Sequence, residues 1–140
     1  MENNVYIITK SKIEKKFKKI KCNTFVVKIE GDKIQNERDL YCEMVEKFNL
    51  PNNVVEENGI NYDVYNDWMT DLTWMNSDES ILLIVNNYYK LLDSNKTSRD
   101  FFTKRLVNHI LPFWEEEVVH TVVGGKRRNF NVYLVVDDDE

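Results

Sequence analysis

The stretch S-I-L-L-I-V-N, residues 80–86, places five apolar residues in a row within a chain of 140 residues. A continuous apolar run of this length is typical of a strand that is buried on both faces, as the strands of a parallel sheet are. The chain is long enough for one domain with a single core. The run therefore predicts an α/β fold with this strand inside the sheet.

Further strands and helices are expected on both sides of this run. Three other segments combine β-branched and apolar residues in the manner of strands: Val5–Thr9, Phe25–Glu30 and Val132–Val136. Helices are predicted from apolar periodicity and capping residues at Ser11–Lys21, Glu37–Phe48 after an Asn36 N-cap, Asn87–Leu92, and from a Thr97/Asp100 capping box onward. Strands that alternate with helices indicate at least three mainly parallel strands.

The C-terminal third admits two interpretations. Pro112 makes a kink or an early stop of the long helix possible. Residues 118–136 then form either a hairpin around Gly124-Gly125, or a helix to about His120 followed by a loop and a last strand. We favour the second interpretation.

Charge is distributed unevenly along the sequence. Residues 1–28 carry eight lysines and two glutamates, whereas residues 29–80 carry thirteen acids and three bases. An acidic surface attracts basic partners and repels nucleic acid. The lysine-rich start is either a solvated polar face or a contact surface for RNA, lipid or an acidic patch, and RNA contact would suit a regulatory adaptor.

Several classes of protein are disfavoured by the composition. No apolar run approaches the roughly 18 residues that span a bilayer, and the N-terminus lacks the basic and apolar regions of a secretory signal. Cys22 and Cys42 do not make a disulfide framework. We therefore expect a cytoplasmic protein with reduced thiols, no cofactor and no membrane partner.

The acidic block contains the run G-I-N-Y-D-V-Y-N-D-W-M-T-D-L, residues 59–72, with aspartates four residues apart. We predict a helix from an Asn61 N-cap to about Trp74. At 100° per residue, its three aspartates fall within about 80° of one another. The polar face of this wheel holds Asp63, Asn66, Asp67, Thr70, Asp71 and Trp74. The opposite face is apolar and holds Val64, Tyr65, Trp68, Met69 and Leu72.

The three carboxylates on one helix face have a modest energetic cost. The helix dipole favours Asp63 in the first turn by about 0.3–1 kcal/mol, but each like-charged i,i+4 pair costs about 0.2–0.5 kcal/mol. Three interpretations are therefore open: the aspartates only face water, they form a surface for a basic partner, or they bind a hard cation. The cation would make the protein a metal-dependent hydrolase that uses Asp63, Asp67 and Asp71, but no second cluster of ligands is evident.

The pattern of these segments resembles the barstar family of small intracellular ribonuclease inhibitors. The resemblance is carried by I-E-G-D-K-I at 29–34, L-P at 50–51, G-I-N-Y-D-V-Y-N-D-W-M-T at 59–70, the buried strand, and V-Y-L-V-V near the end. It implies an α/β fold in which a single layer of about three mainly parallel strands packs with helices. We expect this barstar-like domain to cover residues 24–140 and residues 1–23 to form a basic N-terminal extension.

The resemblance also implies a function without catalysis. In the family, the acidic helix and the loop before it block the active site of a basic ribonuclease, with carboxylates in place of RNA phosphates. Asp67 matches the central acid, Asp63 the earlier one, and Thr70 the polar residue after them. Gly59 and Asn61 match the junction between loop and helix.

Further residues expected to contact the partner lie at positions where this sequence departs from the family pattern. Asn66 stands where tryptophan is frequent, Asp71 where glycine is common, and the loop is longer and carries Glu57. Trp74 is a candidate interface anchor. We expect a monomer when free, whose partner is a basic ribonuclease or a related toxin rather than nucleic acid.

Overall fold

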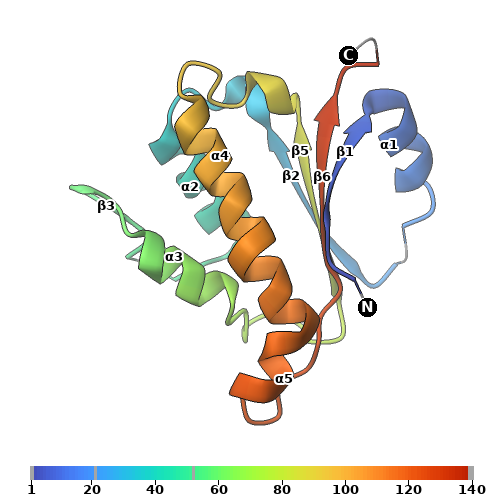
Figure 1. Ribbon diagram of the computed structural model, residues 1–140, viewed down its shortest axis with the longest axis vertical. Helices are drawn as coiled ribbons and strands as arrows, with labels where there is room; N and C mark the ends of the chain where they lie inside the picture. The colour runs from blue at the N-terminus through green and yellow to red at the C-terminus, as the bar shows by residue number, and fades with distance from the viewer. Residues whose placement is uncertain (1, 21, 52, 139–140) are drawn as a thin grey trace.

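The centre of the molecule is a four-stranded parallel sheet with the strand order β1-β6-β5-β2 (Figure 1). The computed structural model describes residues 2–20, 22–51 and 53–138. The strands are β1 (Val5–Thr9), β2 (Thr24–Glu30), β5 (Ser80–Asn86) and β6 (Phe130–Val136). The predicted α/β class with a parallel sheet is confirmed, and the sheet has one strand more than the three or so that the sequence predicts.

Strand β5 lies inside the sheet and is buried on both faces, as its apolar run predicts. It pairs with β2 on one side and with β6 on the other. Leu83 and Val85 belong to the large core on one face, whereas Leu82 and Ile84 belong to a smaller cluster on the other. Each side chain from Ile81 to Val85 is therefore buried, and helices must cover both faces.

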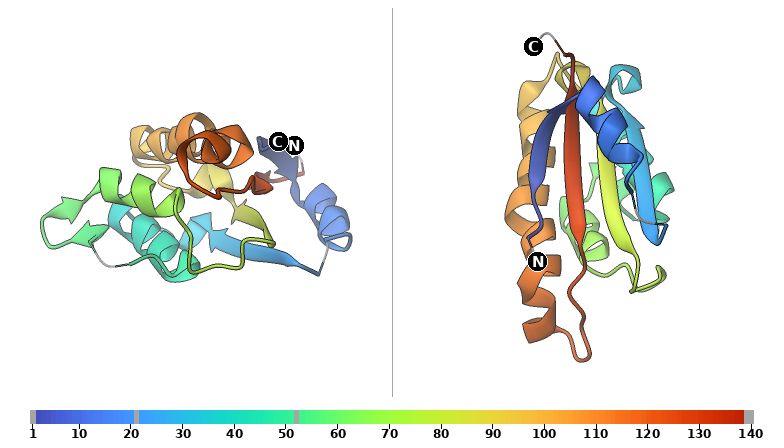
Figure 2. Two further views of the ribbon diagram at one scale, coloured as in Figure 1. Left: turned by 90° about the horizontal axis from the view of Figure 1, so that it is seen from below. Right: turned by 90° about the vertical axis from the view of Figure 1, so that its right-hand side faces the viewer.

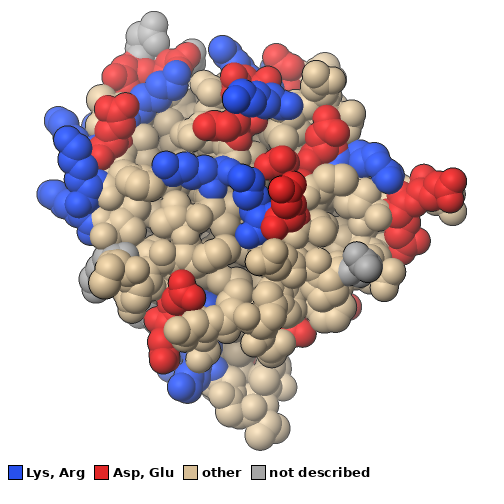
Figure 3. Space-filling model, turned by 180° about the vertical axis from the view of Figure 1, so that it is seen from behind, with Lys and Arg blue, Asp and Glu red and all other residues tan. Residues whose placement is uncertain are grey.

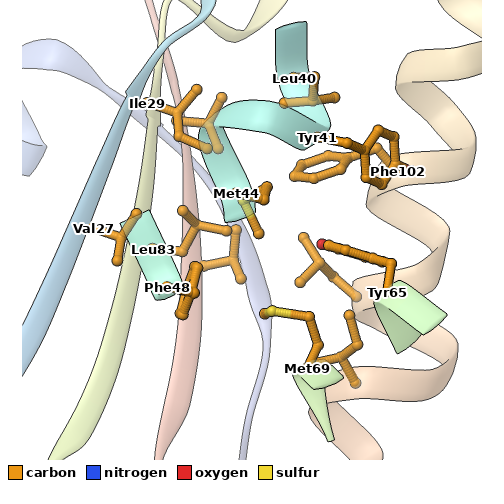
Figure 4. Packing of buried hydrophobic residues seen from close by; sticks show 14 of the residues in the cluster. Val27, Ile29, Leu40, Tyr41, Met44, Phe48, Tyr65, Met69, Leu83 and Phe102 are labelled. Atoms are coloured by element: carbon orange, nitrogen blue, oxygen red, sulfur yellow. The ribbon is translucent and has the colours of Figure 1, made fainter. Parts of the chain in front are cut away.

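The large core lies between the sheet and three helices, namely α2 (Glu37–Phe48), α3 (Tyr62–Met69) and α4 (Lys96–Arg105). Figure 4 shows side chains of the three helices directed toward those of β2 and β5. The bounds of α2 match the prediction, and the Asn36 side chain accepts a hydrogen bond from the backbone N–H of Asp39 at 2.9 Å. Asn36 is thus the predicted N-cap.

The opposite face of the sheet is covered by α1 (Lys10–Phe17), which is shorter than the predicted Ser11–Lys21 helix. Figure 2 shows α1 and α4 on opposite sides of the sheet. Ile13 of α1 packs with Leu82, Ile84 and Val135. Strand β1, which precedes α1, pairs with β6 along its whole length. Residues 5–17, from the basic start of the chain, are therefore a structural part of the sheet and its covering.

The long C-terminal helix continues past Pro112. It runs from α4 through two π-helical segments, Leu106–Ile110 and Phe113–Glu117, into α5 (Val118–Thr121). These π-helical segments flank Pro112. Proline has no N–H to donate and fits where the regular hydrogen bonds of the α-helix are interrupted. A loop then leads to β6, so the helix-loop-strand interpretation is confirmed and the hairpin is wrong.

The start of this long helix differs from the prediction. The Asn95 side chain accepts a hydrogen bond from the backbone N–H of Ser98 at 3.2 Å, so Asn95 is the N-cap and the Thr97/Asp100 capping box is wrong. The short helix predicted at Asn87–Leu92 is a single 3₁₀ turn, Tyr88–Lys90. Among the described residues, no helix is both long enough and apolar enough to cross a membrane.

The packing of α1 yields a stability prediction. Ile13 is 7% exposed, and replacing it with alanine leaves a cavity against β5 and β6. Ile13→Ala should lower the free energy of unfolding by about 2 kcal/mol or more. Ile7→Ala is the matched control, because Ile7 is 63% exposed, and it should cost less than about 1 kcal/mol. Equal effects of the two changes in urea denaturation would show that α1 does not pack on the sheet.

Candidate functional site

The segment before α3 forms a small hairpin rather than the predicted loop. Its strands are β3 (Val55–Glu56) and β4 (Gly59–Ile60), joined by a two-residue turn with Glu57 exposed. Gly59 has a φ of 139°, which residues with a side chain rarely adopt. Arg38 of α2 donates a hydrogen bond to the carbonyl oxygen of Glu56 at 2.7 Å. The hairpin is therefore tied to α2 while its turn projects from the body of the molecule (Figure 1).

Helix α3 begins where the sequence predicts and ends earlier. Asn61 accepts a hydrogen bond from the backbone N–H of Val64 at 3.1 Å and is the N-cap. The helix stops at Met69, and Leu72 has a φ of 50°. This left-handed turn takes the Leu72 side chain into the core, where it is fully buried. The predicted continuation to about Trp74 is wrong because burial of Leu72 reverses the chain.

The early end of α3 separates the predicted polar face into two parts. Asp63 and Asp67 lie exposed on the outer side of the helix. Asp71 and Trp74 lie beyond its end, so their positions on the helical wheel are wrong. The Trp74 indole donates a hydrogen bond to the carbonyl oxygen of Phe48 at 2.9 Å, and Trp74 remains 38% exposed. Trp74 thus ties the segment after α3 to the end of α2.

The carboxylates of Asp63, Asp67 and Asp71 have no ion pair or side-chain hydrogen bond within the described parts of the chain. In those same parts, no group of three or more His, Cys, Asp or Glu side chains is arranged to hold a metal ion. Two negative charges therefore stand on the outer face of α3 without a neutralising partner from the protein.

The remaining polar residues at this helix, Thr70 and Asn66, differ in their hydrogen bonding. Thr70 donates its hydroxyl to the carbonyl oxygen of Asn66 at 2.8 Å. Asn66 is half-buried, and its side-chain oxygen is buried without a hydrogen-bond partner among the described residues. An unsatisfied buried acceptor is costly, so this oxygen is a feature of α3 that stability alone does not explain.

Two concave regions lie at the two ends of α3. A hollow of about 420 Å³ lies between the hairpin and the helix start, lined by Glu56, Asn58, Gly59, Ile60, Asn61, Tyr62 and Asp63. A groove of about 460 Å³ lies beyond the helix end, where Thr70 and Asp71 face residues 122–125 of the loop after α5. The structure thus places Gly59 with Asp63, and Thr70 with Asp71, while Asp67 lies between the two regions.

The start of α3 is held by an aromatic and charged cluster that the sequence did not reveal. The rings of Tyr62 and Tyr65 pack edge-on against Tyr41 of α2, with centroids 5.6 and 4.9 Å away. Arg105 of α4 donates to the Tyr41 hydroxyl at 3.0 Å and lies 4.2 Å from the centre of the Tyr62 ring. The Tyr62 hydroxyl donates to the Glu37 carboxylate at 2.6 Å. Helices α2 and α4 therefore fix the orientation of α3.

The end of α3 is held by the C-terminal helix. The Trp114 indole donates a hydrogen bond to the carbonyl oxygen of Met69 at 2.9 Å. This carbonyl is one of the helix-end groups that have no partner within the helix itself. Both ends of α3 are thus fixed by side chains from other elements, and its outer face is presented on a rigid support.

The cluster around Tyr62 yields a prediction about stability and pH. Burial, and next the hydrogen bond to Glu37, raise the pKa of Tyr62 above its ordinary value of 10.0. Because the pKa is higher in the folded state, the neutral Tyr62 side chain contributes to the free energy of unfolding. This contribution is complete below pH 10.0 and is lost as the pH rises through the folded-state pKa. Tyr62→Phe should lower the free energy of unfolding by about 1 kcal/mol near neutral pH. The variant should also lose less stability than the unaltered protein as the pH is raised above 10.0. Identical alkaline profiles for the two proteins in denaturant titrations would contradict this assignment.

Comparison with known proteins places the chain in a family. The family model described as barstar, the barnase inhibitor, matches residues 24–124. The match begins at the first residue of β2 and contains the hairpin and α3, whereas β1 and α1 lie outside it. No curated protein and no solved structure matches the chain. Because the family model covers more than half of the sequence, the chain belongs to the barstar family.

Proposed function

We propose that the protein inhibits a basic ribonuclease, or a related toxin nuclease, by covering its active site with α3 and the β3–β4 hairpin. The family is that of the barnase inhibitor, so inhibition of a ribonuclease is its family-level function. The observation that carries the proposal for this chain is the pair Asp63 and Asp67. Both are exposed, and neither has a neutralising partner among the described residues.

The charge of these residues fits a ribonuclease active site. Such a site binds the phosphates of RNA through cationic side chains, and carboxylates at a similar spacing can take the place of the phosphates. Like charges repel one another on the free protein and are stabilised opposite a cationic surface. The same complementarity steers the two proteins together and raises the association rate.

The rigid support of α3 favours tight binding. Association costs free energy for every side chain and loop that must be ordered at the interface. Here the N-cap, the Tyr41–Tyr62–Arg105 cluster and the Trp114 hydrogen bond order the helix before any partner arrives. Little of the binding free energy is then lost to ordering of the helix.

The predicted contact residues take different places in this proposal. Asp67 is central, and Asp63 and Gly59 line the hollow at the helix start. Glu57, in the hairpin turn, extends the acidic surface outward. Thr70 and Asp71 border the groove at the helix end. Asn66 adds a half-buried polar group and Trp74 an exposed aromatic one. The same proposal places the protein in the cytoplasm as a free monomer.

Alanine substitutions test the proposed interface. Asp67→Ala should weaken inhibition most and Asp63→Ala next, because each removes a charge that is desolvated on binding. We take the size from the family's own barnase–barstar complex, in which close charge pairs couple by about 1.5–7 kcal/mol. The partner is obtained by affinity capture from the host's ribonucleases, with barnase as a second probe. Binding is measured by titration calorimetry and inhibition by RNA cleavage.

Controls separate a specific interface from general acidity. Asp93→Ala removes an exposed aspartate beyond the hairpin and α3, and it should leave binding unchanged. The affinity of the unaltered protein should fall as the salt concentration rises. Salt screens the attraction between exposed charges, and at 0.1 M it largely removes it beyond about 10 Å. An Asp63→Ala/Asp67→Ala double variant that binds as tightly as the unaltered protein would refute the interface.

A further inference from the structure

We propose that the face of the sheet covered by α1 binds single-stranded nucleic acid. This α1 face is formed by α1 itself and by the side chains of Tyr6, Thr24, Lys28, Asn131 and Tyr133. It includes β1 and α1, which lie outside the range that matches the family model. The proposal stands apart from ribonuclease inhibition and does not depend on it.

Two tyrosines form a stacked aromatic pair on the α1 face. Tyr6 of β1 and Tyr133 of β6 are directly opposite each other in the parallel register. Their rings stack with centroids 5.2 Å apart and planes 20° from parallel. Tyr6 is 41% exposed and Tyr133 is partly exposed. Aromatic rings on an open sheet are surfaces on which unpaired bases stack.

Lysines lie on the same face as this aromatic pair. The Lys16 ammonium lies 5.7 Å from the centre of the Tyr133 ring, and the Lys28 ammonium lies 4.1 Å from the centre of the Phe17 ring. Of the described lysines on this face, Lys10 pairs with Asp137 at 2.9 Å. Within the described residues, the others form no ion pair: Lys12, Lys15, Lys16, Lys18, Lys19 and Lys28. Figure 3, seen from behind, shows basic side chains gathered along the edge where α1 lies.

A groove connects the lysines to the aromatic pair. Its volume is about 320 Å³, and Lys16, Lys19 and Tyr133 line it together with the neutral polar residues Thr24, Ser80, Asn129 and Asn131. Cations along a groove bind a phosphate backbone, and hydroxyl and amide groups can hydrogen-bond the edges of bases. The groove therefore offers each kind of contact that a single strand requires.

These features favour nucleic acid over other anionic partners. An acidic protein, or the acidic surface of a second copy of this chain, would pair with the lysines and leave the stacked tyrosines without a role. A membrane surface would require a broad exposed apolar face on α1, and Phe17 is the one large apolar side chain that this helix exposes among its described residues. Single-stranded nucleic acid uses the charges, the polar groove and the aromatic rings together. It also avoids Asp63 and Asp67, which lie on α3 across the sheet from α1.

Binding of a labelled oligouridine of about 12 nucleotides, measured by fluorescence polarisation, tests the proposal. Tyr6→Ala and Tyr133→Ala should each weaken binding about 5-fold or more, because stacking of one base contributes about 1–3 kcal/mol. Tyr6→Phe should retain binding, since it keeps the ring. The plot of log affinity against log salt should have a negative slope. In the Lys16→Ala/Lys19→Ala variant this slope should be less steep, by about 0.7 for each lost phosphate contact.

Matched controls come from elsewhere on the surface. Tyr89 is 48% exposed on the 3₁₀ turn after β5, and Lys104 is exposed on α4. Tyr89→Ala and Lys104→Ala should leave binding unchanged. Thermal melting of every variant verifies that the fold is retained, and the Tyr6→Phe protein keeps the test informative if an alanine variant unfolds.

Three outcomes would overturn the proposal. The first is no binding of oligouridine at about 50 mM salt, where phosphate contacts are strong. The second is binding that depends on the lysines and not on the tyrosines, with heparin or phosphatidylserine vesicles bound as tightly, which would indicate a general polyanion surface. The third is equal affinity for duplex RNA, in which the bases cannot stack on tyrosine.

Discussion

The burial of β5 on both faces is the constraint on which the rest of the structure depends. Residues 81–85 are apolar on both sides of the sheet and must be covered on both. On one face α2, α3 and α4 supply the large core, and on the other α1 supplies a smaller one. Each covering helix has an inner apolar side and an outer polar side. The outer sides of α3 and α1 differ in charge, so covering one strand produces an acidic surface and a basic surface on opposite sides of the sheet.

The acidic surface owes its geometry to contacts made beneath it. Helix α3 is only eight residues long, and helices of this length are marginal in water by themselves. Its orientation comes from Tyr41 and Arg105 at one end and from Trp114 at the other. The free energy that holds Asp63 and Asp67 in place is therefore supplied by the core. The two aspartates can then repel each other mildly without disturbing the helix.

The sequence predicts those features that depend on neighbouring residues. Local capping by Asn36 and Asn61 identified where α2 and α3 begin, and the apolar run identified β5. The end of α3 could not be predicted, because it depends on the burial of Leu72 and on the hydrogen bond from Trp114 to Met69, 45 residues away. The aspartates on the helix were recognised, whereas the residues that hold it in place act over long sequence distances and have no local pattern.

The most direct test of the central claim is a competition for the partner ribonuclease between this protein and a mononucleotide that occupies the enzyme's phosphate site. The claim is that Asp63 and Asp67 take the place of substrate phosphates. The apparent Kd of the protein should therefore rise linearly with the concentration of the nucleotide, as for two ligands that exclude each other. A ternary complex of enzyme, nucleotide and protein, with an unchanged Kd, would contradict the claim.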